Sequence, residues 1–473
     1  MKRRWMMTAL ATSVVASCTP VEADTAEPAP LEVENAPIPQ TPDPPAQPSN
    51  HPSRAGSLSV EIIPQYAKVV AGDRGHMDVL VRLQADEVPG AERPPLDLAL
   101  VLDRSGSMAG EKLAAAKQAA METVRKLEPD DHLTFVSYDD RVRVHTHRAK
   151  VGDGKALRRQ ILRIDDGGGT ALGPALRSGL DELTGAQRGD DVLAHLMLLS
   201  DGQANEGEAR PHVLAAWAAE AAGRGVATST LGVGLDYNED LMTKIADAGG
   251  GRYHFIEDGS KVPEILGDEF AGLTATVARN VTVGVEGAAG IEVGEIPGYP
   301  NAIDGDAVVA KVGSLSAGRK RELLVRMDYA PPQGQSMALG TFTLRFRDVL
   351  DDGKPVELVL EPSVGVTDDP AAAEASENYV VTVRAQEIDV AAALQSASEH
   401  VNDGRFDDAR QGLQQKAETL RKQAAENPDV NYAPMIEDLE EAEKGLDEAK
   451  DSAIGRKLYQ KKSKAKAYRK RKK

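Results

Sequence analysis

The spacing of apolar residues divides the chain into segments of different secondary structure. Residues 58–83 alternate between apolar and polar positions, as half-buried strands do. Between residues 96 and 273, short continuous apolar runs alternate with stretches of helical periodicity, which is typical of a parallel sheet covered by helices on both faces. Residues 277–360 return to strand alternation, and residues 372–450 have a helical period. The pattern predicts an α/β domain between two β-rich segments, followed by helices.

The α/β region is the most regular part of this pattern. Its apolar runs are rich in Leu, Val and Ala and have the length of buried strands. We expect strands at residues 96–102, 132–137, 142–145, 193–200, 226–233 and 252–256, and helices at residues 111–127, 172–183, 211–222 and 240–248. A doubly wound, mostly parallel sheet is therefore the predicted fold of residues 96–275.

The flanking segments are predicted to form two further units. Residues 58–90 hold too few strands for a core of their own. We therefore expect them to pair with strands from residues 277–365 and to complete a β-sandwich, into which the α/β domain is inserted. Residues 372–455 are predicted to form a helical hairpin, with a break at residues 402–404 (Asn-Asp-Gly).

The N-terminus has the pattern of an export leader. Residues 2–4 are Lys-Arg-Arg, and the apolar stretch at residues 5–15 is too short to span a bilayer. Residues 15–18 (Val-Ala-Ser-Cys) resemble the lipobox of bacterial lipoproteins, with Val in place of the usual Leu. On that resemblance residues 1–18 are a lipoprotein signal peptide and Cys18 is the lipidation site. The alternative is an ordinary signal peptide with an incidental cysteine.

A proline-rich segment follows the leader. Residues 19–54 contain ten Pro, six acidic residues and no Lys, so we expect residues 19–57 to be a disordered tether. A lipid anchor at Cys18 would place the exported protein in the cell envelope, periplasmic or on the cell surface. Thr19 is not the Asp that retains some bacterial lipoproteins at the inner membrane, which favours the outer membrane.

Charge is distributed unevenly along the chain. The 56 basic and 74 acidic residues give a formal net charge of −18, but eleven of the basic residues lie within residues 456–473, which we predict to be a basic disordered tail. The remaining acidic body would repel phosphates, so we expect no nucleic-acid partner. The single cysteine excludes an intramolecular disulfide and multi-cysteine metal sites.

Polar residues with metal-binding potential follow three of the apolar runs. Asp103, Ser105 and Ser107 come directly after the first strand of the α/β region, Thr170 lies in a Gly-rich loop, and Asp201 follows the strand at residues 193–200. The set resembles the metal-ion-dependent adhesion site of von Willebrand factor type A domains. That resemblance implies that the two Ser and the Thr bind an ion directly, and that the two Asp bind it directly or through water.

The chemistry of this set selects the ion. Carboxylate and hydroxyl oxygens are hard ligands, which suit Mg²⁺, with Mn²⁺ or Ca²⁺ as possibilities. Loops at the C-terminal ends of parallel strands meet at one edge of the sheet. Mg²⁺ prefers six oxygens, so five side chains leave a position for the carboxylate of a partner protein.

The function expected from these features is metal-dependent binding or adhesion by a membrane-anchored bacterial lipoprotein. Residues 249–256 resemble the last strand of secreted bacterial type A domains related to inter-alpha-trypsin inhibitor heavy chains. Phosphate-binding loops, nucleophile elbows and zinc-protease motifs are lacking from the sequence, so we expect no catalysis. Two alternatives remain: a metal-dependent hydrolase, or an interaction protein that acts through its C-terminal helices and uses the metal structurally.

Overall fold

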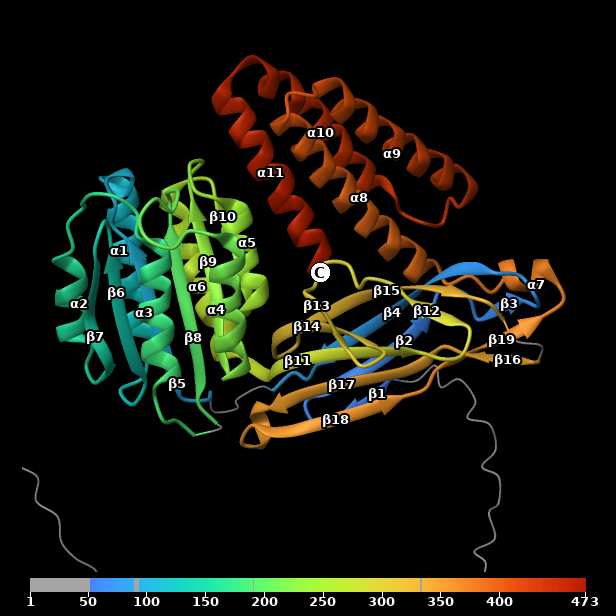
Figure 1. Cartoon of the computed structure of the whole chain (residues 1–473), viewed down its shortest axis with the longest axis horizontal. Coiled ribbons are helices and arrows are strands. Elements are labelled where there is room, and N and C mark those ends of the chain that lie inside the picture. Colours follow the sequence, from blue (N-terminus) through green and yellow to red (C-terminus); the bar gives the residue numbers. More distant parts are fainter. Residues whose placement is uncertain (1–51, 89–92, 190, 332–333) are drawn as a thin grey trace, which may run out of the picture. The chain divides into compact units, whose positions relative to one another are not determined.

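The computed structural model describes residues 52–88, 93–189, 191–331 and 334–473. The predicted signal peptide, Cys18 and most of the predicted tether lie outside the described residues. The described chain forms an α/β region, a β-sandwich and a set of C-terminal helices (Figure 1). Within this described part, no helix combines the length and the apolar character needed to cross a bilayer.

The α/β region is built on a six-stranded sheet with the order β10-β9-β8-β5-β6-β7. Five strands are parallel, and β7 is antiparallel to β6 at one edge. The strands are β5 (Leu96–Asp103), β6 (His132–Tyr138), β7 (Val142–Lys150), β8 (Leu193–Ser200), β9 (Val226–Val233) and β10 (Gly250–Ile256). Every residue of β5 and β8 is buried, as expected for central strands covered on both faces. The predicted doubly wound, mostly parallel sheet is confirmed.

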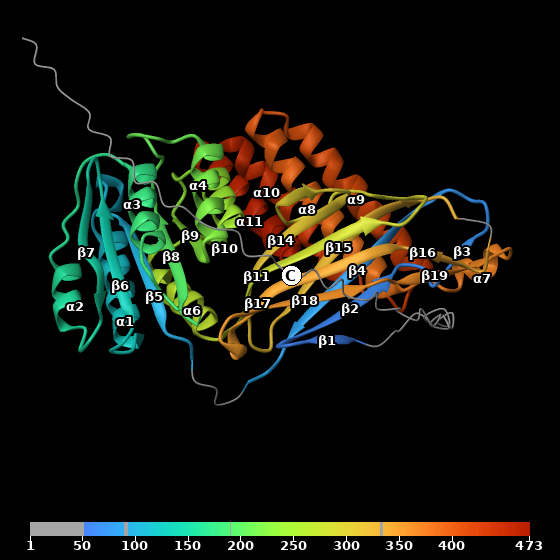
Figure 2. The same cartoon turned by 60° about the horizontal axis from the view of Figure 1, so that its bottom comes forward.

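Helices cover both faces of this sheet (Figure 2). One face carries α1 (Glu111–Lys126), α2 (Lys155–Leu162) and α6 (Val262–Thr274), and the other carries α3 (Leu172–Thr184), α4 (Pro211–Gly223) and α5 (Glu239–Ala248). Helices α1, α3 and α4 bury Ala and Leu side chains against the strands, which suits a chain with only 4% aromatic residues. Two of the helices, α2 and α6, were not among the sequence predictions.

The β-sandwich combines strands from both sides of the α/β region. Its sheets have the orders β1-β2-β4-β15-β12 and β13-β14-β11-β17-β18, with a small third sheet β16-β19-β3. The strands are β1 (Ser53–Ala55), β2 (Leu58–Pro64), β3 (Lys68–Val70), β4 (Gly75–Ala85), β11 (Thr276–Gly287), β12 (Ile291–Val293), β13 (Asn301–Asp304), β14 (Ala307–Ser316), β15 (Lys320–Tyr329), β16 (Ser336–Ala338), β17 (Gly340–Asp348), β18 (Lys354–Leu360) and β19 (Ser363–Thr367). Strand β4 pairs with β15 from Gly75 to Gln84, which is the pairing across the insertion that the sequence predicted.

Two predictions about this part of the chain need correction or refinement. Residues 53–55 were assigned to the disordered tether but form β1, because their backbone pairs with β2. Strands β4 and β15 are buried on both faces rather than one, since α8 (Tyr379–Asn402) covers the face that lies outside the sandwich core. Leu80 and Leu324 contact Val381 and Ile388 there.

The C-terminal helices form a bundle rather than the predicted hairpin. The bundle consists of α8, α9 (Phe406–Glu426), α10 (Ala433–Asp451) and α11 (Ala453–Arg471), preceded by the short α7 (Pro370–Glu374). Side chains from all four long helices share one apolar core, to which α11 contributes Tyr459 and Ala467. A hairpin of two helices would have left this apolar surface exposed to water.

The basic tail is helical, which contradicts its predicted disorder. Helix α11 begins after Ser452, whose hydroxyl accepts a hydrogen bond from the Gly455 backbone N–H. It runs between the α/β region and the other helices (Figure 1). Its lysines form ion pairs with acidic residues of both neighbours, including Lys464 with Glu239 and Lys466 with Asp438. These distant carboxylates relieve the charge repulsion that was expected to keep the segment unfolded.

Candidate metal centre

The five predicted ligands lie at one edge of the parallel sheet. Asp103 is the last residue of β5, and Asp201 directly follows the last residue of the neighbouring β8. The two strands are parallel, with Leu102 opposite Leu199, so both carboxylates leave the sheet at the same edge. Thr170 lies in the loop before α3.

Hydrogen bonds connect both carboxylates to the serine hydroxyls. Asp103 accepts bonds from the Ser105 backbone N–H (2.8 Å) and from the Ser200 hydroxyl (2.6 Å). Asp201 accepts a bond of 2.7 Å from the Ser107 hydroxyl, which lies 3.1 Å from that of Ser105. Both carboxylates are completely buried, whereas Ser107 is exposed. The hydroxyl side of the cluster therefore faces solvent.

The Thr170 loop is tied to the first loop through backbone contacts. Gly106 N–H donates to the Gly168 carbonyl (3.1 Å), and Gly167 N–H donates to the Arg104 carbonyl (2.8 Å). A side chain at Gly167 would collide with the Asp139 carboxylate, since its Cβ would lie 2.2 Å from Oδ2. Glycine is therefore required for this close approach.

The position of Thr170 is also held from the Asp201 side. The Asn205 side-chain carbonyl accepts a 2.8 Å hydrogen bond from the Thr170 backbone N–H. A Cβ placed on Gly202 would lie 3.1 Å from the Thr170 hydroxyl and 3.5 Å from that of Ser107. The structure thus brings all five predicted residues together.

Electrostatics at this cluster are dominated by burial. Burial raises the pKa of the Asp103 carboxyl above its ordinary value, hydrogen bonds from Ser200 and Ser105 oppose that shift, and the charge of Asp201 adds to it. Two buried carboxylates at one edge of a sheet are unfavourable without a neighbouring positive charge. The cluster is therefore expected to attract a cation.

A lysine of the chain itself contacts the cluster. The Lys112 ammonium donates to Asp201 Oδ2 (2.5 Å) and to the Ser107 backbone carbonyl (3.3 Å). Its side chain is one-third exposed, so it has room to move away. In the described part of the chain, no three His, Cys, Asp or Glu side chains are placed to share an ion. The donors here are hydroxyls and two carboxylates, which fit a hard divalent cation rather than a metal that prefers nitrogen or sulfur.

Sequence reasoning missed three residues that complete this cluster. Lys112 compensates Asp201, Ser200 holds Asp103, and Asn205 holds Thr170. Lys112 lies in the first turn of α1, five residues after Ser107, where a long side chain can reach back to the loop. That spacing was the available signal for Lys112. The roles of Ser200 and Asn205 depend on contacts between strands and loops that are distant in sequence.

Comparison with known proteins agrees with this geometry. Residues 97–268 match the family model of the von Willebrand factor type A domain, so the chain contains such a domain. An uncharacterized protein of Synechocystis is 35% identical over 170 residues, which cover 36% of this chain and 39% of that protein. Human inter-alpha-trypsin inhibitor heavy chain H3 is 28% identical over 159 residues, which cover 32% of this chain and 18% of the heavy chain. The expected relationship to the heavy chains is thus confirmed, although the chain spans less than two-fifths of either relative.

Solved structures extend the agreement on fold beyond the type A domain. A von Willebrand factor type A protein from Catenulispora acidiphila superimposes with a TM-score of 0.63 at 20% identity, covering 85% of this chain and 91% of that one. The ArnB paralog VWA2 from Sulfolobus acidocaldarius gives a TM-score of 0.56 at 17% identity, covering 87% and 98%. Both matches are too long to be confined to residues 97–268, so they include parts of the flanking regions.

Proposed function

We propose that the type A domain binds a partner protein through a divalent cation held by Asp103, Ser105, Ser107, Thr170 and Asp201. The observation that carries this proposal is the convergence of five oxygen-bearing side chains with a cationic group, Lys112, already in contact with one of them. Type A domains commonly act as metal-dependent interaction modules. Mg²⁺ is the ion that we favour because the donor set is made of hard oxygens.

The residues of the cluster would contribute to ion binding in two different ways. Ser105, Ser107 and Thr170 would offer hydroxyl oxygens to the ion, while the buried carboxylates of Asp103 and Asp201 would supply the compensating charge. A bound divalent cation offers an open position to a carboxylate from outside. Because Ser107 is exposed, the partner would approach from the solvent side of this hydroxyl.

We further propose that the protein acts in the bacterial cell envelope, anchored through a lipid on Cys18. This part rests on the sequence pattern of residues 1–18. The measurement that tests it is mass spectrometry of the mature N-terminus. An acylated Cys18, together with unprocessed precursor in a Cys18→Ala variant, is expected. A free N-terminus downstream of Cys18 would contradict the anchor and leave the metal site untouched.

Metal binding is tested first, without any partner. Calorimetry with Mg²⁺ should show binding to the wild-type chain and none to Thr170→Ala or Asp201→Ala. Mg²⁺ should also raise the melting temperature of the wild type, because it binds the native state. The absence of binding up to millimolar Mg²⁺ would overturn the proposal. Binding that survives an Asp103→Ala, Asp201→Ala double substitution would place the ion elsewhere.

Partner capture is tested next with envelope extracts. Immobilised wild-type protein should retain a partner in Mg²⁺ and release it in chelator, and the Asp201→Ala variant should retain none. Truncation after Asp369 is unsuitable as a test of the C-terminal helices, because it would remove Tyr468 from the core of the α/β region. Charge reversals on exposed residues of α9, such as Lys422, test these helices without that damage. Loss of partner in those variants, with metal binding intact, would favour the helices as the interaction module.

A further inference from the structure

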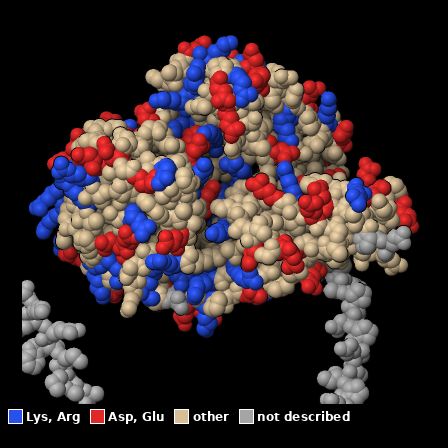
Figure 3. All heavy atoms as spheres, viewed as in Figure 1, with Lys and Arg blue, Asp and Glu red and all other residues tan. Residues whose placement is uncertain are grey.

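A cavity of about 440 Å³ lies where the α/β region, the sandwich and α11 meet. Its walls come from β10, α6, β14, the start of β15 and the end of α11. Figure 3 shows the surface hollowed between these regions, with Lys and Arg side chains gathered around the hollow. This cavity is separate from the metal centre and shares none of its five residues.

Close packing of two backbones forms one wall of the cavity. Gly250 in β10 and Gly313 in β14 both have positive φ angles, and a Cβ on Gly313 would lie 2.3 Å from the Gly250 carbonyl oxygen. On another side, Tyr468 of α11 packs edge-on against Tyr253, with ring centroids 5.5 Å apart. The cavity therefore exists only when the three regions are docked together.

Four arginines line this cavity, one from each of four segments. They are Arg252 in β10, Arg319 in the turn between β14 and β15, Arg321 in β15 and Arg469 in α11. None of them forms an ion pair with a carboxylate in the part of the chain that the structure describes. Among the described residues, the one hydrogen bond of their side chains runs from Arg321 to the Lys320 carbonyl (3.1 Å). We call this site the arginine cavity.

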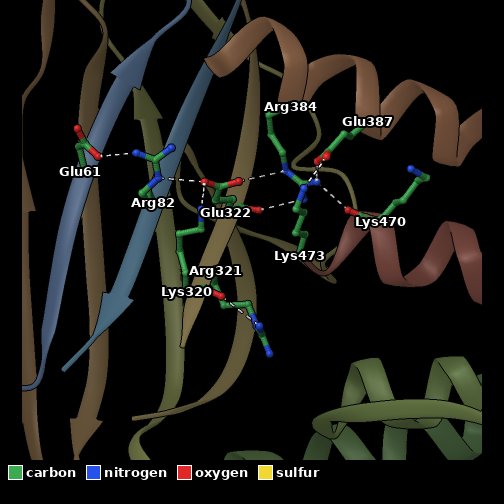
Figure 4. A network of polar contacts seen from close by, with 9 residues as sticks. All are labelled: Glu61, Arg82, Lys320, Arg321, Glu322, Arg384, Glu387, Lys470 and Lys473. Carbon is green, nitrogen blue, oxygen red and sulfur yellow. Dashed lines mark hydrogen bonds and ion pairs between the residues drawn. The ribbon is translucent and has the colours of Figure 1, made fainter. Parts of the chain in front are cut away.

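Two neighbouring arginines outside the cavity form ion pairs. Arg82 contacts Glu61 and Glu322, both at 2.9 Å, and Arg384 contacts Glu387 at 2.8 Å. Figure 4 shows this network and shows Arg321 pointing away from it. Carboxylates are abundant in the chain, with 74 acidic against 56 basic residues. The unpaired state of the four arginines therefore does not follow from a shortage of acids.

The carboxylate that lines the cavity is already engaged. Glu269 is the one acid among the described lining residues, and it accepts hydrogen bonds from Ser229 (2.5 Å) and His254 (2.9 Å). Lys472, a fifth cation of the wall, pairs with Asp247 at 2.9 Å. The four guanidinium groups thus leave a strong excess of positive charge.

The arginines are close enough to affect one another. Burial lowers the pKa of Arg321; the next-largest effect, from Tyr299, raises it, and the charges of Arg252 and Arg319 lower it by smaller amounts. Arg252 and Arg321 are half-buried, whereas Arg319 and Arg469 are exposed to solvent, so an anion that enters the cavity would meet positive charge both at the mouth and inside. The cavity has the size of a site for a small molecule.

We propose that the arginine cavity binds a small soluble compound that carries two or more negative charges on phosphate groups. Guanidinium groups bind phosphate oxygens through paired hydrogen bonds in a fixed planar geometry, which favours Arg over Lys at such sites. Arg252, Arg319, Arg321 and Arg469 would surround the ligand from three regions of the fold. Its binding would hold those regions together, because no single region contains the whole site.

The test uses pyrophosphate as the probe and the folded chain without its leader. Calorimetry in chelator, which removes any contribution of the metal centre, should show saturable binding of pyrophosphate and weaker binding of inorganic phosphate. Arg321→Gln and Arg252→Gln should each weaken binding by about tenfold or more, since each removes a charge-assisted hydrogen bond. Arg143→Gln is the matched control, because Arg143 is exposed on the distant edge strand β7; we expect less than about a twofold change there.

Four results would overturn the proposal. The first is the absence of pyrophosphate binding at millimolar concentration, and the second is unchanged binding in an Arg252→Gln, Arg321→Gln double variant of confirmed fold. The third is equal binding of succinate and pyrophosphate, which would remove the assignment to phosphate. Binding to phosphatidylglycerol vesicles without binding of pyrophosphate would also contradict a soluble ligand. A pyrophosphate-induced rise in melting temperature that both single variants lose would support it.

Discussion

The metal centre and the arginine cavity place opposite charges at two sites and balance them in different ways. At the metal centre, two buried carboxylates are compensated from within the chain by hydroxyl groups and by Lys112. At the arginine cavity, four arginines line one hollow, and the carboxylate beside them is held by His254 and Ser229. At the metal centre, the Lys112 ammonium supplies a positive charge that a bound cation can replace. Among the described residues, the four arginines have no carboxylate partner, and the proposed anion would supply the opposite charge.

The two sites also differ in how their residues are distributed along the chain. The metal-centre loops follow adjacent parallel strands of one domain, so their convergence is a property of the sheet. The arginines come from β10, the β14–β15 turn, β15 and α11, so their convergence depends on docking between three regions. We therefore expect the metal centre to tolerate changes at the domain junction and the arginine cavity to be sensitive to them.

The largest expected effect is a loss of ligand binding at one site that leaves the other site unchanged. Asp201→Ala should abolish Mg²⁺ binding, with a loss beyond the ~100-fold that removal of an outer-shell partner can cause, and should leave pyrophosphate affinity unchanged. Calorimetry with each ligand measures both effects. Asp130→Ala, which removes an exposed carboxylate in the loop before β6, is the control and should alter neither. Loss of both ligands in Asp201→Ala would show that the sites are coupled.

The next effect tests whether docking of α11 builds the arginine cavity. Tyr468 is buried, contacts Tyr253 edge-on and donates a hydrogen bond to Asp247. Tyr468→Ala should lower the free energy of unfolding by about 3–4 kcal/mol, as large aromatic deletions do, and should weaken pyrophosphate binding. Urea unfolding and calorimetry provide the measurements. The control is Tyr379→Ala, at a position that is 44% exposed, which should lower the free energy of unfolding only slightly. Unchanged pyrophosphate affinity in Tyr468→Ala would argue against a cavity wall built by α11.

A third prediction concerns the pH dependence of stability at the cavity wall. Burial of Glu269 tends to raise its pKa, but the hydrogen bond and charge of His254 and the charge of His195 lower it to about 2. Because the pKa of Glu269 is lower in the folded state than in the unfolded state, the ionised carboxylate stabilises the fold at pH values above about 4.5. That contribution is lost as the pH falls from 4.5 toward 2. The size of this pKa shift limits the contribution of Glu269 to the free energy of unfolding to about 3 kcal/mol.

Urea unfolding between pH 6 and pH 2 measures this contribution. Glu269→Gln should be less stable than the wild type at pH 6, and the difference should shrink as the pH approaches 2. Glu264→Gln changes an exposed acid of the same helix and should show no such convergence. A constant difference between Glu269→Gln and the wild type across the range would contradict the prediction.

The smallest effect concerns Lys112. Its ammonium occupies the charge-compensating position at Asp201, so Lys112→Met should raise Mg²⁺ affinity by roughly three- to tenfold by removing a competing cation. The exposed Lys150 of β7 offers a matched control, and Lys150→Met should leave the affinity unchanged. A lower Mg²⁺ affinity in Lys112→Met would instead make Lys112 a positioning residue that keeps Asp201 in place.

Prediction from the sequence was accurate where structure is local. The strands at residues 193–200 and 226–233 match β8 and β9 at both ends, because a short apolar run in a covered parallel sheet leaves little ambiguity about its length. Helix α2 was missed since it has only eight residues, and the short strands of the sandwich were missed for the same reason. The spacing of Lys112 from Ser107 allowed its side chain to reach the loop, but its contact with Asp201 lies between residues that are distant in sequence.

The sequence by itself determined the doubly wound sheet and the convergence of the five residues at the candidate metal centre. Its strand periodicity and its strand-end motifs are local signals, and parallel neighbouring strands bring their C-terminal ends to one edge whatever surrounds them. Only the tertiary structure decided the state of the basic C-terminal segment and the existence of the arginine cavity. Glu239 and Asp438, which pair with the lysines of α11, lie outside that helix in sequence, and the unpaired arginines come from three segments that are distant in sequence, around residues 252, 319–321 and 469. Electrostatic energy depends on distance in space, which composition and periodicity do not specify.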